Sequence, residues 1–339
     1  MKKLLTFLSC LLLLSGCAYA PAQTARESFE CMDTFMNVEI CGGEETAAAV
    51  HAEIERLDGL LSASAEDSDI GRLNRAKSVT PDRTTYELLE KSLGACAELE
   101  GYLDISVYPL VEEWGFIGRD YRVPGQASID RLLQSVSYQG VRLSARESEP
   151  PILYAEIGEN MKIGLGAVAK GFAADRARSV MEADGVTSGI LNLGGTVAAV
   201  GKKPSGAAWR VGICDPENTA NYFGAVEASD QVIATSGSYE RYFEENGRRY
   251  CHIIDPKTGY PVDNGTVSVT VISDSGFQSD ALSTALFVMG RENAERYWKD
   301  KGGFEFILLD DNEELWLTKG AAERFRLADG YDFPIHTIE

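Results

Sequence analysis

The chain has 339 residues, a formal net charge of −20 and only three histidines. A chain of this length can bury a large core and form one large domain or two closely packed ones. The negative charge argues against nucleic acid as a partner, because phosphate backbones are held by clustered Lys and Arg. One phosphorylated ligand is still compatible with it, since a metal ion or a few cations can set the local field. The small number of histidines excludes a His-rich metal site.

The first residues have the pattern of an export signal. A basic start, Met1-Lys2-Lys3, precedes the apolar run Leu4 to Leu14, which is too short to span a membrane comfortably. The following Leu14-Ser15-Gly16-Cys17 resembles a bacterial lipoprotein signal, in which the chain is cut before the cysteine and the cysteine carries the lipid. A plain secretory peptide cut near Ala18 to Ala20 is the alternative. We predict a signal peptide over residues 1–16, which leaves 339 − 16 = 323 residues in the mature chain.

The remaining residues divide into a tether and a folded domain. Residues 17–28 contain Pro21 and show no apolar periodicity, so we predict a short tether there. Residues 29–339 are predicted to be the folded domain. We expect it to lie outside the cytoplasm, anchored to the bacterial cell membrane by the lipid on Cys17, with no other transmembrane candidate.

The predicted domain contains five cysteines, which are Cys31, Cys41, Cys96, Cys214 and Cys251. Their number is odd and no metal-like CxxC spacing is present. We predict mostly buried thiols, and a Cys31–Cys41 bridge is the alternative.

Strand-like and helical segments alternate in the first part of the domain. The predicted elements are a strand at Glu30–Ile40, an amphipathic helix at Glu44–Leu61, a polar loop at Asp67–Asn74, a helix from Pro81 to about Glu98, a short helix at Asp130–Val136 and hairpin strands within Arg142–Leu153. Between them, the apolar segment Gly101–Leu110 contains Asp104, which on local grounds alone would cap a turn.

A glycine-rich turn joins a predicted strand, Met161–Leu165, to a predicted helix that extends from about Ala167 to Ala183. Glycines between a strand and a helix allow backbone amides to approach a phosphate at the helix N-terminus, and Lys170 adds a positive charge one turn into the helix. The segment is not a Walker loop, because Lys170 is followed by Gly171 and not by Ser or Thr. A tight strand–helix turn without a ligand is the alternative.

Paired glycines interrupt the next predicted strand, Ile190–Val197. Gly194 and Gly195 indicate either a close approach of the backbone to a ligand or a simple bulge or turn. Further strands are predicted at Arg210–Cys214, Gly224–Ala228, Val232–Gly237 and Val267–Ser273.

His252 ends a short apolar strand before an Asp-Pro-x-x-Gly turn, Asp255–Gly259. It is a candidate acid–base group. A histidine with a purely structural role beside the turn is the alternative.

The predicted helix Ser279–Gly290 places Asp280 and Thr284 four residues apart on a single face. A carboxylate and a hydroxyl in the first helical turn suit a Mg²⁺ ion that also holds substrate phosphates and water. The alternative is that Asp280 only caps the helix and Thr284 is a tolerated polar residue. Apolar residues at helical spacing predict that one face of this helix belongs to the core.

The last part of the chain is predicted to contain a helix at Ala294–Lys299 and a hairpin of Phe304–Asp310 with Glu314–Thr318. Several hairpins among helices argue against one regular parallel sheet. We predict an α+β fold with mixed, mostly antiparallel sheets flanked by helices.

Several of these stretches together resemble the ApbE family, the FAD:protein FMN transferases. The matching stretches are Met32-Asp33-Thr34-Phe35, Leu103-Asp104-Ile105-Ser106-Val107 with Trp114-Gly115-Phe116, Gly166-Ala167-Val168-Ala169-Lys170-Gly171, Leu191-Asn192-Leu193-Gly194-Gly195 and His252-Ile253-Ile254-Asp255-Pro256-Lys257-Thr258-Gly259, with the helix Ser279–Gly290 following in the expected order. The resemblance covers nearly the whole mature chain and implies an ApbE-like fold. It also implies a Mg²⁺-dependent reaction in which the FMN half of FAD passes to a Thr or Ser hydroxyl of an exported flavoprotein and AMP is released.

The resemblance further implies roles for individual residues. Mg²⁺ would be held by Asp280, Thr284 and the backbone carbonyl of Ala167. FAD would be contacted by Met32, Tyr102, Leu103, Asp104 and Ile254, and its pyrophosphate by Lys170, Gly194 and Gly195. His252, Lys170 and Asp280 would be the catalytic residues, with His252 giving acid–base help.

Three positions depart from the pattern of the family. Many relatives have an aspartate where this chain has Gly164, often an aromatic residue where it has Ser64, and in some members a second metal-side aspartate where it has Ser283. One polar contact and one stacking contact to FAD are therefore in question, and the metal would have fewer protein ligands and more water.

Two other functions are compatible with the same motifs. The chain would act as an FAD pyrophosphatase if water were the acceptor. It would be a non-catalytic flavin-binding lipoprotein that delivers its ligand to a transporter if Asp280, Thr284 and Lys170 had no chemical role.

Overall fold

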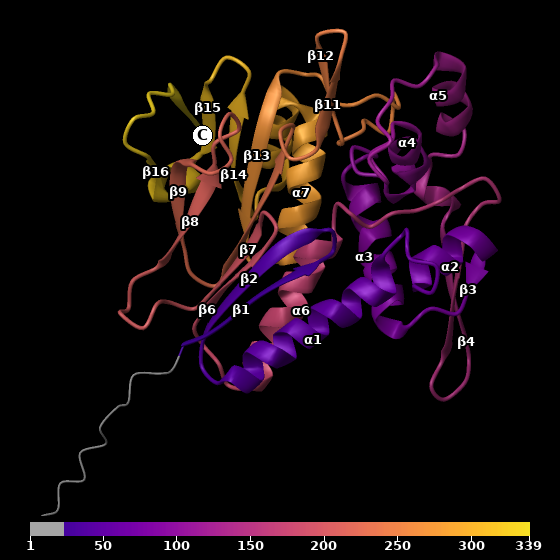
Figure 1. The fold of residues 1–339 in the computed structure, drawn as a ribbon, viewed down its shortest axis with the longest axis horizontal. Helices are drawn as coiled ribbons and strands as arrows, with labels where there is room; N and C mark the ends of the chain where they lie inside the picture. Colours follow the sequence, from indigo (N-terminus) through magenta and orange to yellow (C-terminus); the bar gives the residue numbers. More distant parts are fainter. Residues whose placement is uncertain (1–23) are drawn as a thin grey trace, which may run out of the picture.

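The computed structural model describes residues 24–339, and most of its strands belong to one large sheet (Figure 1). The predicted signal peptide, Cys17 and the first part of the predicted tether lie outside the described residues. In strand order the large sheet consists of β1 (Thr24–Cys31), β2 (Thr34–Cys41), β6 (Gly189–Leu193), β7 (Thr196–Val200), β10 (Gln231–Gly237), β13 (Thr266–Ser273), β14 (Glu305–Asp310), β15 (Leu315–Thr318) and β17 (Ile335–Ile338). Neighbouring strands are antiparallel except for β15 and β17, which are parallel.

The other elements surround this sheet. Small sheets are formed by β8 (Trp209–Cys214), β9 (Tyr222–Ala228) and β16 (Phe325–Leu327), by β3 (Ser78–Val79), β4 (Arg142–Arg146) and β5 (Ile152–Glu156), and by β11 (Tyr242–Glu245) with β12 (Arg248–Cys251). The helices are α1 (Glu44–Leu61), α2 (Asp69–Ala76), α3 (Arg83–Glu98), α4 (Tyr108–Glu113), α5 (Gln126–Leu133), α6 (Ala169–Ala183), α7 (Gly276–Met289), α8 (Arg291–Lys301) and α9 (Lys319–Arg324), with 3-10 turns at Ile105–Val107 and Tyr138–Gly140. The prediction of an α+β fold with mixed, mostly antiparallel sheets is confirmed.

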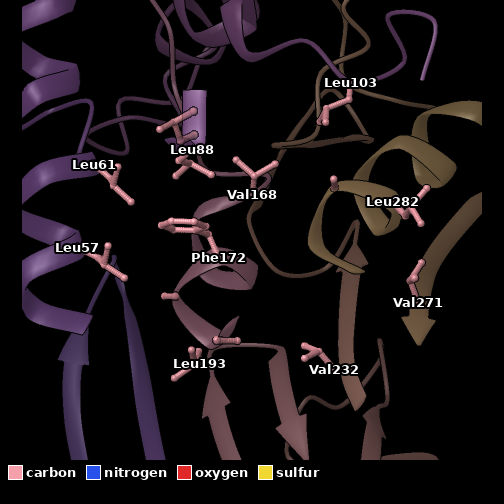
Figure 2. Packing of buried hydrophobic residues seen from close by; sticks show 14 of the residues in the cluster. Leu57, Leu61, Leu88, Leu103, Val168, Phe172, Leu193, Val232, Val271 and Leu282 are labelled. Carbon is pink, nitrogen blue, oxygen red and sulfur yellow. The ribbon is translucent and has the colours of Figure 1, made fainter. Parts of the chain in front are cut away.

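Both faces of the large sheet are covered, which explains why its central strands are apolar at successive positions. Val271 of β13 packs in a cluster with α1, α6 and α7, whereas the next residue, Ile272, packs on the opposite face with β8, β9 and α9. Figure 2 shows the first cluster, with Phe172 of α6 between α1 and the centre of the sheet. Because successive side chains of a strand point to opposite faces, one continuous apolar strand can supply both clusters.

Several predicted elements are confirmed closely. Helix α1 has the predicted bounds, β4 and β5 form the predicted hairpin, and β14 pairs with β15 as predicted. α6, α7 and α8 also occur where helices were predicted, although their ends differ by a few residues.

The prediction of a single strand at Glu30–Ile40 is wrong, because this segment contains a hairpin. β1 and β2 pair in register across a two-residue turn at Met32 and Asp33, whose φ angles are 50° and 59°. Positive φ at both positions is the geometry of turns that match the twist of a hairpin. β1 begins at Thr24, so the sheet includes the end of the segment predicted as a tether.

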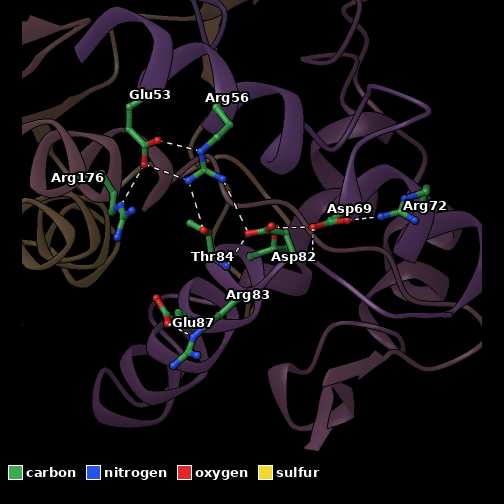
Figure 3. A network of polar contacts seen from close by, with 10 residues as sticks. Glu53, Arg56, Asp69, Arg72, Asp82, Arg83, Thr84, Glu87 and Arg176 are labelled. Carbon is green, nitrogen blue, oxygen red and sulfur yellow. Dashed lines mark hydrogen bonds and ion pairs between the residues drawn. The ribbon is translucent and has the colours of Figure 1, made fainter. Parts of the chain in front are cut away.

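The prediction of a polar loop at Asp67–Asn74 is also wrong, because most of it is helix α2. The Ser68 hydroxyl accepts a hydrogen bond from the Gly71 amide and caps the helix. Asp69 is buried, but its carboxylate accepts hydrogen bonds from the Asp82 amide and the Thr85 hydroxyl, and it also contacts Arg72 (Figure 3). The polar composition therefore reflects capping and buried hydrogen bonds, not a loop.

The predicted strand at Met161–Leu165 is absent from the described residues, because this segment pairs with no strand. The side chain of Asn74 takes the place of a neighbouring strand: its amide group donates to the Ile163 carbonyl at 2.9 Å and its oxygen accepts from the Ile163 amide at 2.7 Å. The apolar pattern was interpreted correctly as buried and incorrectly as part of a sheet.

Helix α7 begins three residues earlier than predicted, at Gly276. Ser275 caps it, and the Asp175 carboxylate of α6 accepts hydrogen bonds from the Gly276 and Phe277 amides at 2.6 and 3.0 Å. Asp280 is therefore in the second turn, so the alternative that it caps the helix is excluded. α7 is also buried on most of its circumference and not on a single face, because it lies between the sheet and α6.

The five cysteines of the described residues are free thiols, and Cys31, Cys96 and Cys251 are buried as predicted. In the hairpin register Cys31 faces Thr34 while Cys41 faces Thr24, so the alternative of a Cys31–Cys41 bridge is excluded. No helix within residues 24–339 is both long enough and apolar enough to cross a membrane.

Helices α6 and α7 approach each other through two glycines. A Cβ atom on Gly171 would overlap the Gly276 carbonyl oxygen and lie 2.6 Å from the Asp280 Cβ, and one on Gly276 would overlap the Gly171 carbonyl oxygen. At this point the two backbones are therefore in direct contact, and no side chain larger than hydrogen fits between them.

We expect Gly171→Ala to lower the free energy of unfolding by about 3 kcal/mol, because the new methyl group meets backbone that cannot move aside. Urea denaturation of the purified protein measures the change. Gly94→Ala is the matched control, since Gly94 lies within α3 and an added Cβ meets no atom within 4 Å. It should instead stabilise the protein by about 0.5–1 kcal/mol. Equal effects of the two substitutions would contradict this account of the crossing.

Candidate active site

One end of the large sheet gathers turns that are far apart in the sequence. Met36 of β2 faces Leu193 of β6, so the Met32–Asp33 turn and the Gly194–Gly195 turn lie at the same end. The pairing of β7 with β10 and of β10 with β13 places Gly237 at this end too. The first turn of α6 and the middle of α7 lie beside it, since Thr196 and Ser236 both contact α7 side chains.

Asp280 is the best-anchored predicted site residue. It is 4% exposed, and its Oδ2 accepts a hydrogen bond from the Gly171 amide at 2.8 Å. Its Oδ1 has only longer contacts, at 3.4 Å to the Thr196 hydroxyl and 3.8 Å to the Lys170 ammonium. One carboxylate oxygen is thus fixed by the protein, while the other is directed toward Lys170 with bonding capacity to spare.

The Ala167 carbonyl is available for a ligand because of the same hydrogen bond. In a regular helix the Gly171 amide would donate to the carbonyl four residues earlier, which is that of Ala167. Here Gly171 donates to Asp280, and within residues 24–339 no backbone amide donates to the Ala167 carbonyl. An unpaired carbonyl beside a carboxylate is the type of oxygen ligand that was predicted at this position.

Thr284 lies one helical turn after Asp280 and belongs to a cluster of hydroxyl groups. Its Oγ1 lies 3.2 Å from the Ser236 Oγ, which also contacts the Ser283 Oγ at 2.9 Å. Ser283 is fully buried and donates to the Asp280 carbonyl, so it faces the sheet and not the predicted metal position. The cluster leaves Thr284 as the hydroxyl ligand candidate on the same helix face as Asp280.

These donors fit a magnesium ion better than a transition metal. Within residues 24–339 no three His, Cys, Asp or Glu side chains are grouped in a way that could hold a metal. One carboxylate, one hydroxyl and one carbonyl are hard oxygen ligands, and Mg²⁺ commonly uses few protein ligands and retains several waters. The residues that the resemblance assigned to the metal are therefore chemically compatible with Mg²⁺.

The Gly194–Gly195 turn is close to two charged residues that the sequence analysis missed. Both glycines have positive φ, and a Cβ on Gly195 would lie 3.6 Å from Oε1 of Glu240. The next residue, Arg241, donates a hydrogen bond to the Asp33 carbonyl in the β1–β2 turn. A Glu-Arg pair, separated by two residues from the Ser-Gly end of β10, was the available sequence signal.

Surrounding protein and neighbouring charges raise the pKa of the Glu240 carboxyl group. Partial removal from water contributes most, the Asp280 charge adds to it, and Lys170 and Arg241 oppose it. Glu240 is nevertheless exposed on one side. Water on that side screens the neighbouring charges.

His252 is neutral near pH 7 and lies among cations. Its pKa is lowered to about 4. Burial is the main cause, and the positive charges of Arg241 and Lys170 contribute to the lowering. The backbone amide of His252 donates to the Arg241 carbonyl, while its buried Nδ1 has no hydrogen-bond partner within residues 24–339. An unpartnered nitrogen in a polar site is unusual and is consistent with a role toward a ligand.

The remaining predicted FAD contacts lie beside this group, and several have roles in the fold. The Lys257 ammonium is 3.4 Å from the centre of the Tyr102 ring, which links two of the predicted motifs. Leu103 and Ile254 are 3% and 5% exposed. Asp104 accepts hydrogen bonds from the Ser106 amide and hydroxyl and from a later backbone amide, so it caps a turn as the local alternative proposed.

Tyr108 occupies the space beside Gly164. A Cβ on Gly164 would lie only 2.6 Å from the Tyr108 ring, and Tyr108 is 8% exposed. A larger residue at position 164 is therefore incompatible with this ring position. Ser64 is exposed and its hydroxyl contacts that of Ser62, so it provides no stacking surface.

Two cavities among the described residues lie away from this group. One cavity of about 300 Å³ lies between α3, α7 and α8, and another of about 240 Å³ lies near Glu112 and Lys162. Neither is lined by Asp280, Lys170 or His252. The candidate active site is defined by its polar groups at the sheet end and not by a closed cavity.

Comparison with known proteins identifies the family of the chain. The model of the ApbE family matches residues 32–308. The FAD:protein FMN transferase of Salmonella typhimurium is 31% identical over 337 residues, which cover 92% of this chain and 94% of the relative. That of Treponema pallidum is 33% identical over 304 residues, which cover 84% of each chain.

Solved structures show the same fold. The crystal structure of the ApbE protein of Thermotoga maritima has a TM-score of 0.82 and 28% identity, covering 90% of this chain and 100% of that chain. The flavinyl transferase ApbE of Pseudomonas stutzeri in its apo form has a TM-score of 0.74 and 28% identity, covering 85% and 91%. The chain belongs to the ApbE family, which confirms the predicted family, its fold and an enzyme of the flavin transferase type.

The low pKa of His252 predicts a pH dependence of stability. Its folded-state pKa of about 4 is below the unfolded value of 6.5, so the unfolded chain binds the proton more tightly. The stabilising contribution of neutral His252 is fully present above pH 6.5 and falls by about 3 kcal/mol as the pH decreases through 4.

We expect His252→Asn to lose this contribution. Urea denaturation of both proteins at pH 7 and pH 4.5 measures it, and the variant should lose less stability between the two pH values than the wild type. Parallel losses would contradict burial of a neutral histidine.

Proposed function

We propose that the chain transfers the FMN half of FAD to a Thr or Ser hydroxyl of an exported flavoprotein and releases AMP, with Mg²⁺ as cofactor. The observation that carries the proposal is the meeting of Lys170, Asp280 and the unpaired Ala167 carbonyl where α6 begins, next to the Gly194–Gly195 turn. Relatives that match most of the chain are named FAD:protein FMN transferases.

The pyrophosphate of FAD would lie at the N-terminus of α6. Free amides and the helix dipole favour a phosphate there, and Lys170 is 25% exposed and can reach it. Gly194 and Gly195 present backbone without side chains on the other side. Met32 and Tyr102, with Leu103, Asp104 and Ile254 supporting the wall behind them, would contact the rest of FAD.

Mg²⁺ would be held by Asp280, Thr284 and the Ala167 carbonyl. When bound, it neutralises phosphate charge and polarises the phosphoryl group. The chain itself orients Asp280 through the Gly171 amide and supplies Lys170 as a second positive charge. Positioning and charge stabilisation of this kind account for most of the catalysis of phosphoryl transfer.

His252 would act as a neutral hydrogen-bonding group beside the transferring phosphoryl. Its unpartnered Nδ1 and its place among Lys170 and Arg241 support this role. A base with a pKa of about 4 is a weak proton acceptor near pH 7, because an efficient base has a pKa near the working pH.

The function is tested with the purified full-length chain in detergent, FAD and MgCl₂, with and without an exported flavoprotein domain that contains a candidate Thr. AMP, free FMN and protein-bound flavin are followed together. Bound flavin that forms with AMP only when acceptor and metal are present is the expected result. Free FMN released at the same rate without acceptor would instead indicate a pyrophosphatase, and FAD binding without cleavage would indicate a flavin carrier.

Asp280→Asn should abolish most of the metal-dependent reaction while leaving the fold intact. The amide oxygen can still accept from Gly171, but the negative charge is lost, so we expect AMP release to fall by about 10²–10³-fold. Asp300→Asn is the matched control, because Asp300 is an exposed carboxylate on α8. Unchanged AMP release in Asp280→Asn would refute the metal role of this residue.

Membrane anchoring through Cys17 is a further part of the proposal, supported by the lipoprotein-like signal. Cys17→Ser should prevent incorporation of labelled palmitate and move the protein from the membrane fraction to the soluble fraction of the cell envelope. Retention of the variant in the membrane fraction would exclude the lipid as the anchor.

A further inference from the structure

The Glu240 carboxylate lies at the candidate active site, and within residues 24–339 it has no hydrogen-bond or ion-pair partner. It follows β10, and Tyr239 before it is 9% exposed and packs against Gly237, where an added Cβ would lie 2.9 Å from the Tyr239 Cδ1. This packing directs Glu240 toward Gly195, with Oε1 3.6 Å from where a Cβ would be. The carboxylate therefore faces bare backbone at the turn that we assign to the pyrophosphate.

The charges around Glu240 are arranged on several elements. Lys170 on α6, Asp280 on α7 and the adjacent Arg241 act on its carboxyl group. Burial raises the pKa of the Tyr239 phenol and of the Cys214 thiol, and the nearby Glu240 charge adds to both shifts. Within residues 24–339 none of them forms a hydrogen bond or a close ion pair with Glu240.

A free carboxylate at a phosphate site requires an explanation. It repels an anionic ligand, and it faces the backbone of Gly195 at the turn assigned to the pyrophosphate. Glu240 is open to solvent on one side, so an incoming hydroxyl group can reach it. A carboxylate in this position can accept a proton from that hydroxyl as it approaches the phosphorus atom.

We propose that Glu240 is a further catalytic residue, the base that removes the proton from the acceptor hydroxyl during FMN transfer. The hydroxyl oxygen forms a bond to the phosphorus atom on the FMN side, and the bond from that phosphorus to the bridging oxygen breaks. The proton passes to the Glu240 carboxylate, and the electron pair leaves with AMP. The inference rests on the proposed function, since it identifies the base for that reaction.

Two properties make Glu240 a better base than His252. Its pKa is raised from the ordinary glutamate value, which increases its affinity for the proton, whereas that of His252 is lowered to about 4. It is also open to solvent, whereas the His252 Nδ1 is buried. The acceptor protein must approach from outside, so the accessible group is the one that meets its hydroxyl.

The test compares wild type with Glu240→Gln and Glu240→Asp, using the full-length chain in detergent, FAD and MgCl₂. One arm contains an acceptor domain with a candidate Thr, and a parallel arm uses water as the acceptor and follows AMP alone. Glu240→Gln should lower the single-turnover rate by about 10²-fold or more, and Glu240→Asp should restore part of it. The FAD dissociation constant, measured by flavin fluorescence, should change by less than about threefold.

The pH profile separates a base from a positioning residue. The wild-type rate should rise with pH as Glu240 loses its proton and then level off, and Glu240→Gln should lack this rise. Glu245→Gln is the matched control, since Glu245 is an exposed carboxylate on β11, and it should behave as wild type.

Three results would overturn the inference. They are a Glu240→Gln rate within about threefold of wild type, a loss explained fully by weaker FAD binding, and a pH rise that persists in the variant. If the wild type releases AMP only with water, the proposed transfer function fails while the role of Glu240 is still decided in that arm. If the wild type releases no AMP in either arm, both proposals fail.

Discussion

The direct contact between α6 and α7 at Gly171 and Gly276 is the constraint on which the site depends. The two backbones meet without intervening side chains, which brings the Asp280 carboxylate to the Gly171 amide. That hydrogen bond replaces a regular helical bond in the first turn of α6 and leaves the Ala167 carbonyl without a backbone donor within residues 24–339. A packing requirement of two helices thus places a carboxylate oxygen and an unpaired carbonyl oxygen at a single point. Asp175 secures the same crossing from the other side by capping α7.

The large sheet explains why distant turns converge on this point. Its antiparallel pairing places the β1–β2 turn, the β6–β7 turn and the end of β10 at the same end of the sheet. The contact between α6 and α7 lies beside this end. Both faces of the large sheet are covered, so its central strands are held on either side by packed side chains, such as Val271 on one face and Ile272 on the other. A polar site can therefore be built from short loops, each held by a rigid strand or helix.

The sequence predicted those features whose causes are local or nearly so. The bounds of α1, the β14–β15 hairpin and the positions of Asp280 and Lys170 follow from periodicity, capping and motif order. The prediction failed where a long-range contact replaced a local pattern. Asn74 supplies hydrogen bonds that a strand would have given to Ile163, and Asp175 moves the start of α7.

Glu240 was missed for a related reason. Its significance comes from lying near Gly195, Lys170 and Asp280, which are on other elements, and the Glu-Arg pair in the sequence does not by itself indicate that proximity. The reason for glycine at position 164 could not be predicted from its neighbours either. It arises from the ring of Tyr108, more than fifty residues earlier in the chain.

The balance of positive and negative side chains at the site bears on the proposed phosphoryl transfer. The chain as a whole is strongly negative, yet at this sheet end Lys170 and Arg241 stand against Asp280 and Glu240. A pyrophosphate would add negative charge to a group that is close to neutral. A divalent cation on Asp280 would offset that charge on one side, and Lys170 would do so on another. Protonation of Glu240 would then be favourable, because it removes the repulsion between this carboxylate and the phosphate. The proton would come from the acceptor hydroxyl, which must lose it in the same step.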